Sequence, residues 1–252
     1  MGRTGILGVI FSLISWSSSA QMTWVKGAVV RGDTARKSIA LVFTGHEYAD
    51  GGEAIRQTLN STGTPASFFL TGDFYRSFGP LIRNLRNDGH YLGAHSDKHL
   101  LYCSWEKRDS LLVTREEFVS DLENNYREMR KAGIKKKQAR YFLPPYEWYN
   151  EQIAAWTSAE KLQLVNFTGG TLSHADYTTP SMANYRSSAQ IMAGIQKYEN
   201  EKGMNGFILL VHIGTHPERT DKLYHHLAEL ISGLKQKGYK FIRIDDLVNK
   251  GG

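Results

Sequence analysis

The sequence predicts an α/β protein, a distorted (β/α)7-type barrel, and three observations favour this class. Short apolar segments alternate along the chain with longer amphipathic ones, as strands and helices do in parallel α/β folds. The apolar segments are nearly continuous, which is typical of strands that are covered by helices. Polar residues follow several of these segments, where barrel enzymes carry their functional loops.

Seven segments are expected to be strands because they are short, apolar and rich in β-branched or aromatic residues. They span residues 38–44, 66–72, 90–95, 140–144, 163–168, 206–212 and 240–244. The repetition of strand, helix and strand predicts parallel pairing through right-handed crossovers, and closure into a barrel is the simplest arrangement.

Three of the intervening segments carry clear helix signals. Residues 52–63 are amphipathic and end at a glycine, as do residues 221–238. Residues 114–133 begin with Thr114, and Glu117 follows three positions later, which is the pattern of a capping box. These helices are expected to cover the outer side of the barrel.

The first twenty residues differ from the rest of the chain. Arg3 supplies a positive start, residues 6–14 are apolar, and small residues precede a cleavage position after Ala20. The pattern predicts a signal peptide over residues 1–20, followed by a single domain over residues 21–252. No later segment is apolar for long enough to cross a bilayer, so we expect no stable membrane insertion and a secreted or periplasmic location.

Charge and cysteine content restrict the partners and the chemistry. The formal net charge is +6, but the basic residues are spread along the chain, and their densest run, residues 131–137, is typical of a solvated helix end. Nucleic-acid binding therefore has no support beyond net charge. Cys103 is the only cysteine, which excludes an internal disulfide, and we expect it to be a buried small residue rather than a nucleophile.

Two histidines four residues apart, His95 and His99, follow the third predicted strand. On a helix this spacing would let both imidazoles reach one metal ion. The chain holds a second such pair, His212 and His216, in a segment typical of a loop, so spacing alone does not identify a site. The decision depends on which other residues converge on the same place.

Polar residues follow other predicted strands as well. His46 and Glu47 come directly after the first strand, and His212 ends the sixth. The segments PPYEWY (144–149) and TLSHADY (171–177) follow the fourth and fifth strands. Because the carboxyl ends of parallel barrel strands meet at one rim, we expect these side chains to gather there with the histidine pair.

Taken together, these segments resemble the polysaccharide deacetylase family, also called the NodB-homology or carbohydrate esterase 4 family, over residues 36–248. HSDKH (95–99) is similar to the family's His-Ser/Thr-x-x-His motif, and FLPPY (142–146) and LLVH (209–212) resemble its later motifs. TPASFFLTG (64–72) is similar to the family's second strand. The resemblance implies a NodB-homology-like barrel, in agreement with the number of predicted strands.

The first motif departs from the family pattern, which is usually Thr-Phe-Asp-Asp-Gly at the end of the first strand. Alignment on Thr44 places His46 at the first aspartate and Glu47 at the second. An alternative register treats residues 45–49 as an insertion and matches Asp50 to the end of the motif. We favour the first register because of the distance to the second strand.

The resemblance implies a metal site. In the family, the second aspartate and the two histidines bind a divalent metal, and the first aspartate is the general base. Carried over, Glu47, His95 and His99 would be the metal ligands and His46 the base, with Asp50 as ligand or base in the other register. Two histidines and one carboxylate are a normal catalytic set for zinc, and nickel, cobalt or iron accept the same ligands.

A second departure accompanies the first. Leu143 stands where the family normally has an arginine that pairs with the base aspartate, and Arg140 lies on the opposite face of the same predicted strand. An uncharged imidazole base, His46, needs no cationic partner, so the two departures are consistent with each other. The same paired loss is also what a decayed site would show.

The reaction that the resemblance implies is hydrolysis of an acetamide, chiefly an N-acetyl group on an amino sugar of a carbohydrate substrate. His212 would protonate the leaving amine, and Asp176 would orient the His212 ring. The alternative is that Asp176 only caps a turn. Pro145 and Tyr146 would lie against the substrate, with the Tyr146 N–H directed at the oxyanion.

Other interpretations of the chain stay open. Tyr146, Trp148 and Tyr149 are expected either to form a wall for a sugar ring or to pack within their own loop. A non-catalytic module on the same barrel would bind glycan or metal without turnover. A hydrolase of another amide or of an O-acetyl ester would keep the site and change the substrate.

Overall fold

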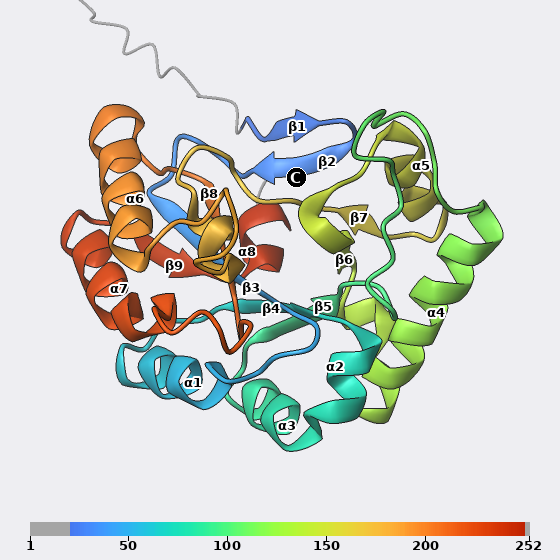
Figure 1. Cartoon of the computed structure of the whole chain (residues 1–252), viewed down its shortest axis with the longest axis horizontal. Helices are drawn as coiled ribbons and strands as arrows, with labels where there is room; N and C mark the ends of the chain where they lie inside the picture. Colours follow the sequence, from blue (N-terminus) through green and yellow to red (C-terminus); the bar gives the residue numbers. More distant parts are fainter. Residues whose placement is uncertain (1–20, 250–252) are drawn as a thin grey trace, which may run out of the picture.

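A curled sheet with helices around its outer side is the framework of the molecule (Figure 1). The computed structural model describes residues 21–249, so the predicted signal peptide lies outside the described residues. The architecture confirms the α/β barrel class that the sequence predicts. None of the helices within residues 21–249 combines the length and the apolar character that crossing a bilayer requires.

The strands carry the polar loops at their carboxyl ends. Within the described residues they are β1 (Thr23–Val25), β2 (Ala28–Arg31), β3 (Ser38–Gly45), β4 (Ser67–Leu70), β5 (Tyr91–Ala94), β6 (Tyr141–Phe142), β7 (Gln163–Leu164), β8 (Phe207–His212) and β9 (Lys240–Ile242).

The helices lie mainly outside the curled sheet (Figure 1). They are α1 (Gly52–Ser61), α2 (Gly72–Ser77), α3 (Gly79–Asn87), α4 (Arg115–Lys131), α5 (Glu151–Ala159), α6 (Ser188–Lys202), α7 (Leu227–Gln236) and α8 (Ile244–Asn249). Four short 3-10 turns join them in the described chain, η1 (Lys136–Gln138), η2 (Pro145–Glu147), η3 (Ser173–Tyr177) and η4 (Leu223–His226).

The strand order is β1-β2-β8-β3-β4-β5-β6-β7, and β9 pairs with the beginning of β3. The pairs from β8 through β3 to β7 are parallel, whereas β2 runs antiparallel to β1 and to β8. An isolated bridge between Val29 and Val165 connects β2 to the chain just after β7 and closes the ring.

The register keeps the carboxyl ends of the central strands level. Thr44 of β3 pairs with His212 of β8, and the next residue of β3 pairs with Leu70 of β4. Leu70 pairs in turn with Ala94 of β5, which pairs with Phe142 of β6. The residues that follow these strands therefore begin at the same height around the rim.

Alternation along β3 divides the core into two parts. Ile39, Leu41 and Phe43 pack in the large apolar cluster between the sheet and the helices, whereas Ala40 and Val42 belong to a smaller cluster that fills the barrel. All five residues are buried, and neighbouring residues of a strand face opposite sides of the sheet. Residues of α8 join the inner cluster and close the amino-terminal end of the barrel.

All seven predicted strands are present, but several are shorter than expected. The segment 140–144 contributes only β6, because Pro144 has no N–H with which to continue the ladder. The segment 163–168 contributes only β7, and its later residues instead bond to β2 and β8, as when the Asn166 N–H donates to the Val29 carbonyl.

The hairpin of β1 and β2 was not predicted from the sequence. Its two-residue turn, Lys26 and Gly27, has positive φ angles of 45° and 81°. Such turns match the twist of paired strands. The sequence signal was weak because Lys replaces the usual Asn or Asp.

The helix predictions differ in their outcomes. The helix predicted over 52–63 is α1, and the one predicted over 114–133 is α4. The segment 221–238 instead forms η4 followed by α7. Helices α2, α3, α5, α6 and α8 were not assigned from the sequence.

The capping box of α4 forms as predicted. The Thr114 hydroxyl accepts from the Glu117 N–H at 3.2 Å, and the Glu117 carboxylate accepts from the Thr114 N–H at 2.7 Å. Two otherwise unpaired N–H groups at the start of the helix are thereby satisfied.

Replacement of this cap is expected to lower the stability of the fold. Thr114→Ala should reduce the free energy of unfolding by about 1 kcal/mol, because an orphan N–H of α4 loses its acceptor. Urea denaturation would measure the change, and Thr114→Ser, which keeps the hydroxyl, should retain most of the stability. Equal unfolding midpoints for Thr114→Ala and the wild type would contradict this role.

Candidate active site

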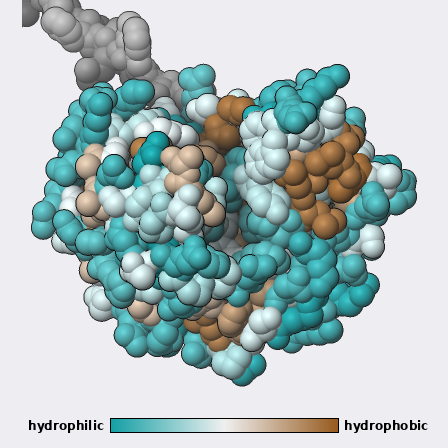
Figure 2. Space-filling model, viewed as in Figure 1, coloured by the Kyte–Doolittle hydropathy of each residue, from teal (hydrophilic) through white to brown (hydrophobic). Residues whose placement is uncertain are grey.

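A cavity of about 470 Å³ opens at the carboxyl ends of the strands. The view in Figure 2 shows a mainly hydrophilic face with a hollow near its middle. The polar and aromatic side chains of the lining are His46, Glu47, Tyr48, His95, His99, Trp105, Tyr146, Glu147, Tyr177, His212 and His216. The rim predicted from the sequence thus brings most of the candidate residues together.

The loop that carries His95 and His99 is fastened to α4. Asp121 accepts the backbone N–H groups of Asp97 and Lys98, each at 3.0 Å, and Asn125 accepts that of His95 at 2.9 Å. Asp121 and Asn125 are four residues apart on one face of α4, and both are buried. Sequence reasoning placed the helix but missed this role, because a buried polar face looks like a solvated one.

His95 is held in a single orientation by the backbone just after β6. Its Nδ1 lies 2.8 Å from the carbonyl oxygen of Leu143, so Nδ1 carries the proton and Nε2 keeps its lone pair. Burial lowers the pKa of His95 to about 3. The ring is therefore neutral near pH 7. The Leu143 side chain itself belongs to the inner core, so only its backbone contributes to the site.

His99 reaches the cavity from a strained turn. Its φ is 55° and that of Ser96 is 72°, both in the left-handed region that is costly for residues with a Cβ. The Ser96 hydroxyl accepts the His99 N–H at 2.8 Å and stabilises the turn. The ring lies 5.0 Å from that of His95 and 4.3 Å from that of Tyr146, centroid to centroid. Burial lowers the pKa of His99 to about 2, so this imidazole is also neutral.

His46 and Glu47 extend from the end of β3 into the same cavity. The His46 ring stacks on the His99 ring at 4.7 Å, and its Nδ1 lies 3.1 Å from the Thr71 hydroxyl. The Glu47 side chain is 64% exposed, and its Oε1 is 3.9 Å from His46 Nε2. Glu47 therefore lies at the outer edge, next to the imidazoles but turned toward solvent.

Asp50 lies outside this cavity. Its carboxylate accepts from the Thr215 N–H at 2.8 Å and from the Tyr224 hydroxyl at 3.1 Å, and it pairs with Lys222 at 2.9 Å. These contacts fasten the loop after β3 to the chain after β8. The structure thus brings His46 and Glu47, but not Asp50, to the histidine pair.

The donor set fits a divalent metal in its chemistry. His95 and His99 are neutral imidazoles, His95 has a free Nε2 lone pair, and the Glu47 carboxylate lines the same cavity. In residues 21–249, however, no three His, Cys, Asp or Glu side chains converge closely enough to hold an ion. Glu47 is the exposed member of the set.

His212, which lines the cavity and is partly exposed, pairs with the buried Asp176. His212 Nδ1 lies 2.6 Å from Asp176 Oδ1, and the second carboxylate oxygen accepts the His212 backbone N–H at 2.8 Å. Burial by itself would lower the pKa of His212, but the charge and hydrogen bond of Asp176 outweigh it, and the pKa is raised. Nδ1 is engaged, so Nε2 is the nitrogen left to exchange a proton with a bound molecule.

The turn η2 brings a carboxyl group into the cavity that sequence reasoning left without a role. Tyr146 and Glu147 both have left-handed φ angles, 58° and 53°. Burial raises the pKa of Glu147 to about 7, which His212 opposes and Asp176 reinforces. Glu147 can therefore exchange a proton near neutral pH. Its position directly after a Pro-Pro-Tyr turn at the rim was the available signal.

The aromatic wall differs from the predicted one. Tyr149 is buried and donates its hydroxyl to the Val25 carbonyl at 2.9 Å, so it does not line the cavity. Trp148 packs beside Trp105, and it is Trp105 that lines the cavity together with Tyr146 and Tyr177.

The remaining candidates also have clear places. Pro145 begins η2 and is buried beneath the cavity lining. His216 lies in a loop, as the sequence predicts, and reaches the edge of the cavity. Cys103 is buried and outside the cavity.

The fold and the site together define a barrel protein with a histidine-rich cavity at its carboxyl rim. The chain belongs to the polysaccharide deacetylase family, whose model matches residues 31–167, more than half of the 252 residues. This match confirms the resemblance drawn from the motifs.

Individual relatives are distant in sequence. The chain is 24% identical over 218 residues to the peptidoglycan-N-acetylmuramic acid deacetylase PdaA of Bacillus subtilis, covering 86% of this chain and 73% of PdaA.

Solved structures share the fold. The Bc1960 peptidoglycan N-acetylglucosamine deacetylase superposes with a TM-score of 0.71 at 19% identity, over 87% of this chain and 92% of that one. BA3943 from Bacillus anthracis, a CE4 family pseudoenzyme, superposes with a TM-score of 0.70 at 17% identity, over 89% and 69%.

Removal of the Glu147 carboxyl is expected to change how stability depends on pH. The folded-state pKa of about 7 lies above the ordinary 4.5, so the folded protein keeps a proton that the unfolded chain has lost. This contribution is present below about pH 4.5 and is lost as the pH rises through about 7. Glu147→Gln should therefore gain stability relative to the wild type between about pH 5 and about pH 8.

Urea denaturation at both pH values would measure this relative gain. Glu123→Gln, which neutralises an exposed carboxylate of α4, is the matched control. A difference between Glu147→Gln and the wild type that does not change with pH would show that Glu147 titrates normally.

Proposed function

We propose that this protein removes N-acetyl groups from an amino-sugar polymer or oligomer by hydrolysis. The observation that carries the proposal is the Asp176–His212 pair, with a hydrogen bond of 2.6 Å, at the same cavity as two neutral histidines. Amide hydrolysis needs a proton donor for the leaving amine as well as a group that activates water. Membership of the polysaccharide deacetylase family supports the glycan as substrate.

We assign the proton donor to His212. Its Nδ1 is held by Asp176, so Nε2 is the atom that would protonate the leaving nitrogen. The raised pKa favours the charged imidazolium, which is the form that can donate. Asp176 acts through His212 and does not contact the substrate, so it is a positioning residue.

We assign the water-activating side of the cavity to the opposite wall. His46 would accept the proton of the attacking water, and its stacking on His99 and its contact with Thr71 hold the ring in place. Glu147 lines the same cavity and is a second proton acceptor there. The backbone N–H of Tyr146 would donate to the tetrahedral oxyanion beside Pro145.

A divalent ion would be held by Glu47, His95 and His99, with zinc first and nickel, cobalt or iron as alternatives. When bound, such an ion lowers the pKa of water toward about 7 and polarises a carbonyl group. The orientation of His95 by the Leu143 carbonyl and the neutral state of both imidazoles support this assignment.

The aromatic side chains at the mouth support a sugar as the ligand. Trp105 and Tyr146 lie edge to face with centroids 5.7 Å apart, and both are about half exposed. Tyr177 is exposed and lies 5.2 Å from the ring of His212. Exposed rings beside the proton donor offer flat apolar faces on which a pyranose can stack. The predicted leader over residues 1–20 supports action on glycans outside the cytoplasm.

The competing candidate is a non-catalytic module on the same barrel. It is favoured by the altered first motif and by the exposure of Glu47. Acetate release from peptidoglycan, chitin oligosaccharides and acetylated xylan would separate these functions. Acetate from an N-acetylated glycan supports the deacetylase, acetate from xylan alone indicates an ester hydrolase, and glycan binding without acetate indicates the module.

Substitution of the first-loop carboxylates tests the proposed ligand set. Glu47→Ala should weaken zinc binding by at least about tenfold and remove activity, because a negatively charged ligand is lost. Asp50→Ala should keep zinc binding and instead lower stability, because it releases Thr215, Lys222 and Tyr224. Titration calorimetry with zinc would measure metal binding by both variants. Loss of zinc binding in Asp50→Ala but not in Glu47→Ala would favour the other register.

Neutralisation of the buried carboxylate tests the proton donor. Asp176→Asn should lower kcat by about 100-fold or more and move the alkaline limb of the pH–rate profile to lower pH. The sign follows because His212 must be protonated, and its pKa falls when the adjacent negative charge is removed. A rate loss with an unmoved alkaline limb would show that Asp176 has only a structural role.

A further inference from the structure

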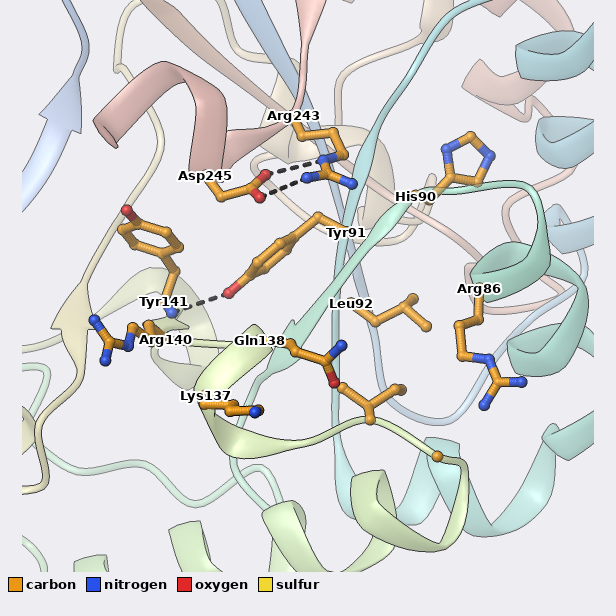
Figure 3. A pocket seen from close by; sticks show the side chains of 12 residues that line it. Arg86, His90, Tyr91, Leu92, Lys137, Gln138, Arg140, Tyr141, Arg243 and Asp245 are labelled. Carbon is orange, nitrogen blue, oxygen red and sulfur yellow. Dashed lines mark hydrogen bonds and ion pairs between the residues drawn. The ribbon is translucent and has the colours of Figure 1, made fainter. Parts of the chain in front are cut away.

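A second cavity, of about 530 Å³, lies at the other end of the barrel (Figure 3). Tyr91 and Tyr141, which line it, are the first residues of β5 and β6. His95, just beyond the end of β5, lines the candidate active site instead. A strand rises about 3.3 Å per residue, so the two cavities are separated by about 13 Å of β5. They share no lining residue.

The lining of this second cavity is strongly basic. Arg86 of α3, Lys137 of η1, Arg140 before β6 and Arg243 before α8 surround it, and Figure 3 shows these side chains on different sides of the opening. Asp245 is the one acidic side chain of the lining, and Arg243 already binds both of its oxygens, at 2.7 and 3.0 Å. Four basic side chains and one acidic side chain, which is already paired with Arg243, give the cavity a positive electrostatic potential.

Two of these cations are unpaired within the described chain, so a ligand would not have to displace an existing partner. Lys137 and Arg140 are exposed, and within residues 21–249 neither side chain makes a hydrogen bond or an ion pair. Arg86 donates one bond, to the Ala132 carbonyl at 2.8 Å. The remaining guanidinium N–H groups are free for planar, bidentate contacts with phosphate or carboxylate oxygens.

The edge of the cavity also holds an unsatisfied donor. His90 is buried, and its Nδ1 accepts the Ala66 N–H at 3.3 Å, which places the proton of the neutral ring on Nε2. That Nε2 is buried and without a hydrogen-bond partner in the described chain. Because this N–H is shielded from the cavity, it is the basic rim that calls for acceptor oxygens.

The floor of the cavity restricts the kind of ligand. Tyr91, Leu92, Ile134 and Tyr141 line it, and they are between 4% and 6% exposed. The Tyr91 hydroxyl accepts the Tyr141 N–H at 2.9 Å, so these rings lie within the barrel wall (Figure 3). Buried rings cannot stack with nucleobases, which argues against nucleic acid. A concave opening fits a chain that enters it better than it fits a flat bilayer.

We propose that this basic cavity binds the oxyanion groups, phosphodiester or carboxylate, of a flexible polyanionic chain. The binding does not depend on the proposed deacetylase activity, since no residue is shared with the candidate active site. Its position at the opposite end of the barrel would let the protein rest on an acidic polymer while the active-site mouth remains open to a glycan.

The test compares two double charge reversals in the full-length protein. Lys137→Glu with Arg140→Glu removes two free cations of the cavity, and Arg115→Glu with Arg127→Glu removes two exposed cations of α4 that do not line it. Binding is measured by calorimetry at low and high salt with poly(glycerol phosphate), polygalacturonate, phosphatidylglycerol vesicles and neutral chitin oligosaccharides as probes. The α4 variant controls for the general loss of positive charge.

We expect a salt-sensitive affinity for at least one of the two polyanions, reduced at least about tenfold in the cavity variant and less than about twofold in the α4 variant. The polymer that binds identifies phosphate or carboxylate as the source of the oxyanion. Equal losses in the two variants, or no binding of either polyanion by the wild type, would overturn the proposal. So would binding confined to phosphatidylglycerol vesicles, which would indicate a membrane surface instead.

Discussion

The level pairing of the parallel strands is the constraint on which the site depends. Thr44 lies opposite His212, and Leu70, Ala94 and Phe142 follow in neighbouring strands at nearly the same height. The segments that follow β3, β5 and β6, and the end of β8, bring polar side chains to the cavity. A slip of one residue in any pair would turn the interior face of that strand outward and displace its loop by about 3.3 Å.

One residue type has two protonation preferences in this cavity because its surroundings differ. His95 is buried and has no carboxylate partner in the described part of the chain, so its neutral form is favoured and its Nε2 lone pair stays available. His212 is also enclosed, but the adjacent carboxylate of Asp176 stabilises its charged form. Placing groups with opposite protonation preferences across one cavity is a general means of assigning acid and ligand roles.

The sequence allowed the barrel and most of the rim to be predicted, because both depend on local patterns. Apolar runs mark buried strands, and the order of polar loops follows from the strands that precede them. The motif around His95 and His99 was specific enough to indicate the family. The register of the first loop was predicted from the distance between strands, and the structure brings His46 and Glu47 to the cavity and leaves Asp50 outside it.

What could not be predicted depends on contacts between distant segments. The role of Asp121 and Asn125 becomes visible only once α4 packs against the histidine loop. The pKa of Glu147 is raised because the folded chain buries its carboxyl group. Trp105, and not Tyr149, lines the cavity because burial depends on the path of the whole loop. The hairpin of β1 and β2 lacked strong turn residues and escaped notice for a local reason.

The closure of the ring by β2 has a mechanical consequence. β3 and β8 are joined along six consecutive residue pairs, whereas β2 meets β8 through the pair Arg31 and Phe207, and the chain beyond β7 through the bridge of Val29 and Val165. A sheet opens most readily where its strands are paired over the fewest residues, which here is at β2. Asn166, next to that join, donates its side-chain amide to the Glu147 carbonyl at 2.8 Å. The short pairings of β2 are thereby connected, through one side chain, to the turn that carries Tyr146 and Glu147 at the cavity.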